Sequence, residues 1–525
     1  MDPQSIGDSK RGPVSKGRSR RQTGFLIGAA LIVLSLASCA RRDVPNAGTV
    51  VVALSAPPST IDPRYATDAT GSRLAGLLFS SLVRIGNDLK PVPDAAESWL
   101  VEGAKITFKL RQGITFSNGR ALTANDVLYS FDQVRDPKSP FHSSFASIKN
   151  VEAHFDAASC VVVVTLERPS ATFLTDLPSV KLLPQAELLK NPEAFADRPI
   201  GTGPFALDSM SSDEIRLRAR HDHPYAAPKI EYAVFKVVRD DNTRALKMAR
   251  GELDLAQAEF PPLKVRMLEK NSALRVLAYP GLAMSYLLIN HADSILSQKN
   301  VRRAIAEAID RDSITKFKLE GLAQPATSLL TPSNPFFDSA LRPLSFDVSA
   351  AKKLIASASV GGTKLDAKLE LKTSNVATGI DNGRIISREL DDIGLNVVTR
   401  SFEWATFYAD IQAGRFQMAI MRWVGTIDPD LYRKAFHSKE IPPVGRNRGH
   451  YVDRKLDELL EQGATTVDAT LRRAIYNKVQ EQVFEDLAII PLWYDTEVAV
   501  VNRRIEGYNP PTDGSYWPLT QVTKK

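Results

Sequence analysis

Few side chains in this sequence have the types and spacing that covalent chemistry requires. The seven His residues are scattered, and only His221 and His223 lie close enough together to suggest a metal site. Pro224 follows them directly and predicts a turn, in which no third ligand is evident. We therefore expect a solvated turn at this place and no bound metal.

Asp391 and Asp392 form a carboxylate pair that acid/base chemistry could use. They lie at the end of a predicted helix before Gly394, so an exposed helix face is the expectation. The segment 201–203 is rich in glycine, but Pro204 removes a hydrogen-bond donor and the pattern is too short to hold a phosphate.

The motifs of common enzymes are missing from the sequence. It contains no Gly-x-Ser-x-Gly elbow, no phosphate loop ending in Gly-Lys-Ser/Thr, no His-Glu-x-x-His and no Cys pair for zinc. Cys160 lies in the apolar run 159–164, where nothing beside it would lower the pKa of its thiol, and it is expected to be an inert core residue. We therefore expect a protein that is not an enzyme and has no cofactor.

Composition and charge exclude several other classes of protein. The 525 residues are 43% hydrophobic and 24% charged, with two Cys, which excludes collagen, wholesale disorder and a disulfide scaffold. The formal charge is 67 − 60 = +7, but residues 1–38 hold six basic and two acidic residues, so the rest carries 61 − 58 = +3. Because no basic stripe is interleaved with aromatic residues, no nucleic-acid partner is expected.

The N-terminal segment has the pattern of an export signal. Residues 1–23 are polar and basic, and residues 24–38 are uncharged and mostly apolar. Fifteen such residues are short for a membrane span, which needs about 20, and the order indicates a secretory signal. The sequence 36–39 ending in Cys39 resembles the lipobox of bacterial lipoproteins. It predicts a signal peptide over 1–38, lipidation of Cys39 and a tether over 39–47; a signal without lipid is the alternative.

Strands and helices alternate along the remaining chain. Apolar runs predict strands at 50–54, 161–166, 234–238, 287–289, 395–398, 416–423 and 488–494. Helices are predicted at 300–310, 380–393, 406–413 and 468–485. Asn300 is the expected N-cap of the first helix, and Asp468 that of the last, in which Leu471, Ile475, Val479 and Val483 share one face. This order predicts α/β lobes with mostly parallel sheets.

A series of short motifs occurs along the chain at residues 61–63, 77–84, 93–99, 107–119, 121–127, 201–205, 301–311, 403–423, 428–430, 451–460 and 490–492. In type and order these motifs resemble those of one family, the extracytoplasmic solute-binding proteins of family 5, which are the peptide-binding components of ABC importers. Each motif is weak alone, but the series covers nearly all of residues 48–510.

The resemblance implies a bilobed, periplasmic-binding-protein-like fold of type II, in the large peptide-binding subclass. Lobe I would be discontinuous, lobe II continuous, and an extra N-terminal region would belong to lobe I. The expected boundaries are 48–60, 200–283 and 493–525 for lobe I, 61–199 for the extra region and 284–492 for lobe II. Closure of the lobes about a hinge would enclose the ligand and present it to a membrane permease.

The resemblance also points to residues that would hold a peptide amine. In peptide-binding members an Asp two or three places after the tryptophan of the 416–423 strand meets that amine. After Trp423 the loop is about two residues shorter here, and Thr426 lies near the acidic position. Asp428 or Asp430 takes over the role, or the ligand lacks a free amine; alternatively both Asp residues only form the turn. Arg422 would reach an anionic group or pair with one of these Asp residues.

Further ligand-binding candidates are aromatic or polar. Trp404, Tyr408, Trp423 and Tyr286 would line side-chain pockets, although aromatic residues near strands are often core residues. Asn290 would donate to the ligand backbone or cap a turn, and Arg384 would bind a carboxylate or remain solvated.

The sequence therefore predicts a monomeric, lipid-anchored solute-binding protein of an ABC importer, with an oligopeptide or dipeptide as its ligand. It would be exported to the periplasm or the cell surface and attached to a membrane through Cys39. A metal chelate, an opine or a saccharide is the alternative ligand, and a lipoprotein hydrolase or scaffold with the same fold is the alternative from another class.

Overall fold

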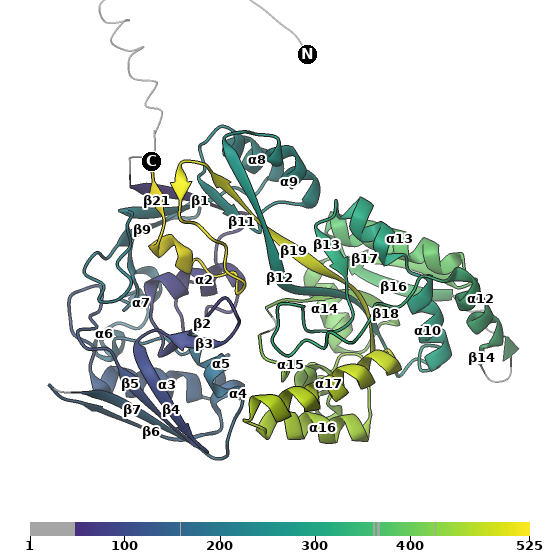
Figure 1. Ribbon diagram of the computed structural model, residues 1–525, viewed down its shortest axis with the longest axis horizontal. Helices are drawn as coiled ribbons and strands as arrows, with labels where there is room; N and C mark the ends of the chain where they lie inside the picture. Colours follow the sequence, from purple (N-terminus) through teal and green to yellow (C-terminus); the bar gives the residue numbers. More distant parts are fainter. Residues whose placement is uncertain (1–47, 158, 361–362, 365–367, 426) are drawn as a thin grey trace, which may run out of the picture. The chain divides into compact units, whose positions relative to one another are not determined.

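The computed structural model describes residues 48–157, 159–360, 363–364, 368–425 and 427–525 (Figure 1). The predicted signal peptide 1–38, the lipidation site Cys39 and the tether 39–47 lie outside the described residues, and so does Thr426.

The centre of the fold is an 11-stranded mixed sheet. Its strands, in spatial order, are β17 (Asn396–Phe402), β16 (Lys368–Ser374), β18 (Met418–Trp423), β12 (Leu274–Ile289), β19 (Ile489–Asn502), β11 (Leu255–Gln257), β1 (Thr49–Leu54), β10 (Tyr232–Val237), β9 (Glu214–Ala219) and β8 (Phe205–Met210), with β13 (Ala323–Pro325) beside β19. The prediction of mostly parallel sheets is wrong. Only β1 with its two neighbours and β16 with its two neighbours pair in parallel, because β12 and β19 run antiparallel to each other and to the strands beside them.

Two long strands, β12 and β19, cross the middle of this sheet. They pair over most of their length, and Figure 1 shows them side by side between the β1 end and the β18 end of the sheet. The register between the two strands shifts between Pro280 and Met284. From Met284 onward β12 also pairs with β18 on its other edge. Gly281 lies at this irregular place, and an added Cβ would lie 2.7 Å from the Asp495 carbonyl oxygen. The predicted lobe boundaries at 283 and 492 fall inside these strands.

Residues 61–199, called the 61–199 layer below, contain a four-stranded antiparallel sheet with its own core, while Leu74, Leu188 and Phe195 pack into the core of β1 and β10. The order of the four-stranded sheet is β4 (Ala96–Glu102), β5 (Lys105–Leu110), β7 (Cys160–Leu166) and β6 (Ile148–Phe155). The other elements are α2 (Ala69–Leu78), β2 (Val83–Ile85), β3 (Pro91–Pro93), α3 (Ala124–Arg135), α4 (His142–Phe145), α5 (Phe173–Asp176), α6 (Gln185–Lys190) and α7 (Ala194–Asp197). Helix α3 begins with a capping box, in which the Thr123 side chain and the Asp126 side chain each accept from the other's backbone amide.

The helices of residues 299–486 cover both faces of the β16–β18 side. They are α10 (Lys299–Ala308), α11 (Arg311–Ser313), α12 (Val348–Ser357), α13 (Ala377–Asp391), α14 (Trp404–Gln412), α15 (Leu431–Phe436), α16 (Arg454–Thr465) and α17 (Ala469–Asp486). The predicted cap Asp468 is confirmed, since it accepts from two backbone amides. The prediction of Asn300 as the N-cap is wrong, because α10 begins at Lys299 and Gln298 occupies the N-cap position. Leu471 is 62% exposed rather than part of a buried face.

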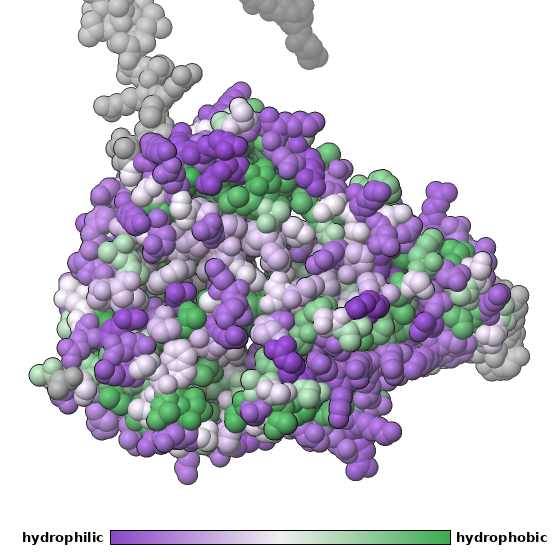
Figure 2. All heavy atoms as spheres, viewed as in Figure 1, coloured by the Kyte–Doolittle hydropathy of each residue, from purple (hydrophilic) through white to green (hydrophobic). Residues whose placement is uncertain are grey.

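The remaining elements are α8 (Asp241–Ala249), α9 (Pro262–Glu269), β14 (Ser359–Val360), β15 (Thr363–Lys364), β20 (Ile505–Glu506) and β21 (Thr523–Lys524). Figure 2 shows hydrophobic residues around the position of α8 and α9, the two helices that carry the exposed Leu246, Leu263 and Met267.

Candidate functional site

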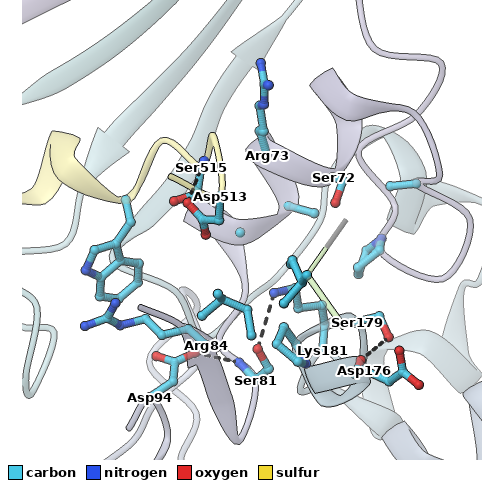
Figure 3. Close-up of a pocket in the computed structure, with 18 of the residues that line it drawn as sticks. Ser72, Arg73, Ser81, Arg84, Asp94, Asp176, Ser179, Lys181, Asp513 and Ser515 are labelled. Atoms are coloured by element: carbon cyan, nitrogen blue, oxygen red, sulfur yellow. Dashed lines mark hydrogen bonds between the residues drawn. The ribbon is translucent and has the colours of Figure 1, made fainter. Parts of the chain in front are cut away.

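A cavity of about 440 Å³ lies where the 61–199 layer meets the C-terminal segment and the loop after β18. This volume falls within the range of small-molecule sites. Its charged lining residues are Arg73, Arg84, Asp94, Asp176, Lys181 and Asp513 (Figure 3). Ile427 contributes from the loop after β18. Three cations and three carboxylates therefore share one cavity, yet no pair among these six is within 4.0 Å. Such a lining can recognise a charged, polar solute.

Lys181 lies in the centre of the polar lining. Its Nζ donates to Ser81 Oγ at 3.3 Å, and the Ser81 amide donates to Asp94 Oδ2 at 2.8 Å, as Figure 3 shows. The other Asp94 oxygen accepts from Tyr225 Oη at 3.0 Å. Desolvation by burial lowers the pKa of Lys181 and raises that of Asp94. Both shifts favour neutral forms in this part of the cavity.

Two arginines of the cavity stack on aromatic rings of the C-terminal segment. The guanidinium of Arg73 lies 5.8 Å from the centre of the Tyr516 ring, and that of Arg84 lies 5.0 Å from the centre of the Trp517 ring. Asp513 accepts from the Ser515 amide at 3.0 Å, and burial raises its pKa. The aromatic faces hold the two cations without neutralising them.

Asp176, at the end of α5, faces the loop after β18. Burial raises the pKa of its carboxyl to about 6, and the negative charges of Asp428 and Asp430 add to the rise, while Lys434 opposes it. In the same helix the Thr175 hydroxyl donates to Asp428 Oδ2 at 3.3 Å. This bond joins the 61–199 layer to the part of the chain that carries β18.

Both predicted amine-binding carboxylates are already in ion pairs. Asp428 accepts from the two terminal nitrogens of Arg472 at 2.7 and 3.0 Å, and Asp430 pairs with Arg433 at 3.1 Å. Burial raises the pKa of Asp430. Arg422, expected to reach an anion or one of these Asp residues, instead contacts two carboxylates of β19. Its Nε is 2.6 Å from Asp495 and its Nη2 3.3 Å from Glu497.

The four predicted aromatic residues are brought together, in two stacked pairs with an arginine between them. Tyr286 and Trp423 stack at 6.4 Å, and Trp404 and Tyr408 stack at 5.6 Å. Arg448 lies over both Tyr408 and Trp423, at 5.3 and 5.2 Å, and donates to the Tyr408 hydroxyl at 3.0 Å. Tyr286 and Trp423 are buried, whereas Trp404 is 54% exposed. The pairs therefore run from the core to the surface.

The two remaining predicted residues differ in their surroundings. Asn290 caps a turn: its Nδ2 donates to the Phe416 carbonyl at 2.8 Å, and its Oδ1 accepts from the Ala292 amide at 3.0 Å. Arg384 is exposed on α13. Neither side chain lines the 440 Å³ cavity.

Sequence reasoning missed Lys181 and Arg448. Lys181 follows an apolar stretch and Arg448 lies in a loop of mixed composition, so neither is part of a periodic pattern. Lys181 stands out by its place in the cavity wall with no carboxylate oxygen within 4.0 Å among the described residues, and Arg448 by its position over two aromatic rings. Such residues are found only when the three-dimensional neighbours are known.

The other chemical candidates have structural surroundings. His223 is buried rather than solvated, its Nε2 lies 3.1 Å from the Thr202 carbonyl, and burial lowers its pKa to about 4. Asp391 and Asp392 are exposed, as predicted. Cys160 is partly buried against the core of the 61–199 layer, and burial raises the pKa of its thiol.

Two further features are absent from the described part of the chain. No group of three or more His, Cys, Asp or Glu side chains there has an arrangement that could hold a metal ion. Among those same residues, no helix combines the length and the apolar character that crossing a bilayer demands.

Comparison with known proteins gives matches over most of the chain. The family model described as bacterial extracellular solute-binding proteins, family 5 Middle, matches residues 90–441. The probable di/tripeptide-binding protein 5 of Pseudomonas aeruginosa (strain UCBPP-PA14) is 27% identical over 496 residues, which cover 88% of this chain and 93% of that protein. The glutathione-binding protein GsiB of Escherichia coli (strain K12) is 26% identical over 498 residues, which cover 92% and 95%.

A solved structure matches over a similar length. It is the ABC transporter-associated periplasmic binding protein DppA from Helicobacter pylori in complex with the peptide STSA. The TM-score is 0.77 at 26% identity, and the match covers 91% of this chain and 98% of that chain. The predicted α/β, periplasmic-binding-protein-like fold is confirmed by this likeness.

Proposed function

The chain belongs to the bacterial extracellular solute-binding proteins of family 5, and we propose that it captures short peptides for an ABC importer and delivers them to a membrane permease. The observation that carries this proposal is the cavity of about 440 Å³, with charged walls, at the junction of the 61–199 layer and the loop after β18. Its relatives include proteins named for di/tripeptide and for glutathione binding. Charged walls suit peptides, which carry a charge at each end.

The mechanism follows from the two strands that connect the parts of the fold. β12 and β19 are continuous, but their register is irregular between Pro280 and Met284. Small changes of backbone angle at such a place rotate one part of the sheet against the other. A ligand that contacts both sides of the cavity stabilises the closed arrangement only by its difference in affinity for the two arrangements. No bond of the ligand is broken in this mechanism.

We place the lobes as the sequence predicts, with lobe I at 48–60, 200–283 and 493–525, the extra region at 61–199 and lobe II at 284–492. In this scheme Thr175 and Asp428 belong to opposite lobes, and their hydrogen bond is a contact between them. Trp404 would offer its exposed face to a ligand side chain, since it stands at the accessible end of the stacked pairs.

We also propose that the protein is a monomeric lipoprotein, exported through the signal at 1–38 and anchored by lipid on Cys39. The motif at 36–39 supports this proposal. Several acyl chains on one Cys would hold the protein at a bilayer, because each buried methylene contributes about 0.8 kcal/mol.

The proposed function is tested by a ligand screen on the chain without residues 1–38. Thermal shift and calorimetry are run with di- to pentapeptides, metal chelates, opines and saccharides, and each ligand is recovered and analysed afterwards. At a ligand concentration of about 100 times Kd the expected gain in stability is about 2.7 kcal/mol. Stabilisation by peptides with unchanged recovery supports the proposal. Stabilisation only by a chelate, an opine or a sugar contradicts the peptide assignment, and a chemically altered ligand contradicts binding without turnover.

A further inference from the structure

The ammonium of Lys181 is the charged group of the cavity that has the fewest partners. It carries three N–H donors, and its hydrogen bond within the described residues is the one to Ser81 Oγ, at the long distance of 3.3 Å. Figure 3 shows the side chain extending from the segment of Asp176 and Ser179 toward Ser81. The remaining donors therefore have no protein acceptor in the part of the chain that the structure describes.

The nearest carboxylates do not neutralise this cation. Asp94 and Asp513 influence Lys181 through their charges, but no oxygen of either lies within 4.0 Å of its Nζ. Both carboxylates are engaged elsewhere: Asp94 accepts from Ser81 and Tyr225, and Asp513 accepts from Ser515. Burial raises the pKa of both, which weakens their negative charge further.

A desolvated cation without an anion partner costs free energy, and proteins normally pair such a cation. The walls of the same cavity add two more cations, Arg73 and Arg84, each held against an aromatic ring instead of a carboxylate. The positive charge of these two arginines is therefore in place before any ligand arrives. An anionic ligand group would provide the missing partner.

We propose that Lys181 binds a carboxylate of the ligand, so that the cavity selects solutes with a free carboxylate over their neutral amides. This inference rests on the proposed function and deepens it, because it names the ligand group that the 61–199 layer recognises. A charge-assisted bond of this kind contributes roughly 1.5–3 kcal/mol, which corresponds to about 10- to 100-fold in affinity.

The test compares matched ligands on matched variants. An equimolar library of di- and tripeptides, each present with a free C-terminal carboxylate and as the C-terminal amide, is incubated with the chain lacking residues 1–38. Retained peptides are identified by native mass spectrometry, and the best pair is measured by calorimetry. The variants are Lys181→Met and, as the control, Lys190→Met, which removes an exposed cation at the end of α6.

The expected result is that the wild type and Lys190→Met prefer the free acids about 10- to 100-fold, while Lys181→Met binds acid and amide alike. Lys181→Met should keep the affinity for the amide and melt no lower than the wild type, because Met removes an unpaired buried charge. Equal binding of acid and amide by the wild type, or an unchanged preference in Lys181→Met, overturns the role of Lys181. If the wild type retains no peptide, the proposed function is contradicted, and the assignment of a carboxylate ligand to Lys181 is contradicted with it.

Discussion

Arg472 holds both carboxylate oxygens of Asp428, with its Nη2 2.7 Å from Oδ1 and its Nη1 3.0 Å from Oδ2. The two side chains are 5% and 14% exposed, so the pair is largely removed from water. Because Arg472 lies in the first turns of α17, it fixes the loop after β18 to that helix. Asp428 is thus neutralised before a ligand binds, and its first role is to hold the loop.

Replacing Arg472 by Met should destabilise the protein strongly. The substitution leaves Asp428 as an unpaired, largely buried carboxylate, for which the cost is about 3–5 kcal/mol. The double variant Arg472→Met/Asp428→Asn should recover much of this loss, since no uncompensated charge remains. Chemical denaturation of the wild type and of the single and double variants measures the effect.

Arg473→Met is the matched control, because the neighbouring arginine is exposed and its guanidinium lies 5.8 Å from the centre of the Phe336 ring. Its change in unfolding free energy should stay within about 1 kcal/mol. If Arg472→Met costs no more than this control, the pair does not anchor the loop.

Asp176→Asn should increase stability near neutral pH. The pKa of Asp176 is raised from 3.8 to about 6, so the folded protein binds this proton more tightly than the unfolded chain does. Stability attributable to this group therefore falls as the pH rises from about 4 to about 6. Because Asn does not titrate, the variant avoids this loss. Its free energy of unfolding should exceed that of the wild type by an amount that grows to about 3 kcal/mol as the pH rises through this range.

Thermal unfolding from about pH 4 to pH 7 measures this difference. The groups that influence Asp176 are Thr172, which directly precedes α5, and Lys434, Asp428 and Asp430 from the part of the chain after β18. Asp213→Asn, in an exposed turn, is the control and should follow the wild-type pH profile. Parallel profiles for Asp176→Asn and the wild type would show that Asp176 is solvated in the folded protein.

The two tryptophans of the stacked pairs should respond differently to truncation. Trp423 is 9% exposed and contacts Tyr286 and Arg448, so Trp423→Ala should cost about 3–5 kcal/mol. Trp404 is 54% exposed, so Trp404→Ala should cost about 1 kcal/mol or less. With a peptide from the screen, Trp404→Ala should weaken binding about tenfold if its face covers a ligand side chain. Denaturation and calorimetry separate the two effects, and unchanged affinity removes Trp404 from the site.

Cys39→Ser should release the full-length protein from membranes. Without a thiol at this position no lipid can be attached, and the apolar segment 24–38 is short for a stable span. Detergent phase partitioning of cell fractions, with mass spectrometry of the N-terminus, measures the outcome. Cys160→Ser is the control, since Cys160 lies far along the chain in β7. A Cys39→Ser protein that still partitions into detergent contradicts the lipid anchor.

Local structure followed from the sequence where a pattern repeats over neighbouring residues. The strand at 49–54, the amphipathic helix at 299–308 and the cap Asp468 are all fixed by residues within a few positions of each other. The same short-range rules failed for strand direction, because whether β12 lies parallel or antiparallel to its neighbours depends on partners hundreds of residues away.

The sequence alone determined those elements whose pattern repeats over neighbouring residues, the ordered motifs that identify the family and four aromatic residues that meet in space. Only the tertiary structure decided which charges are satisfied. It paired Asp428 with Arg472, 44 residues away, turned Arg422 to β19, 73 and 75 residues away, and left Lys181 in a cavity beside Ser81, 100 residues away. The physical reason is that periodicity reports which face a residue occupies, whereas the neutralisation of a charge depends on atoms within a few ångströms, whichever segments bring them there.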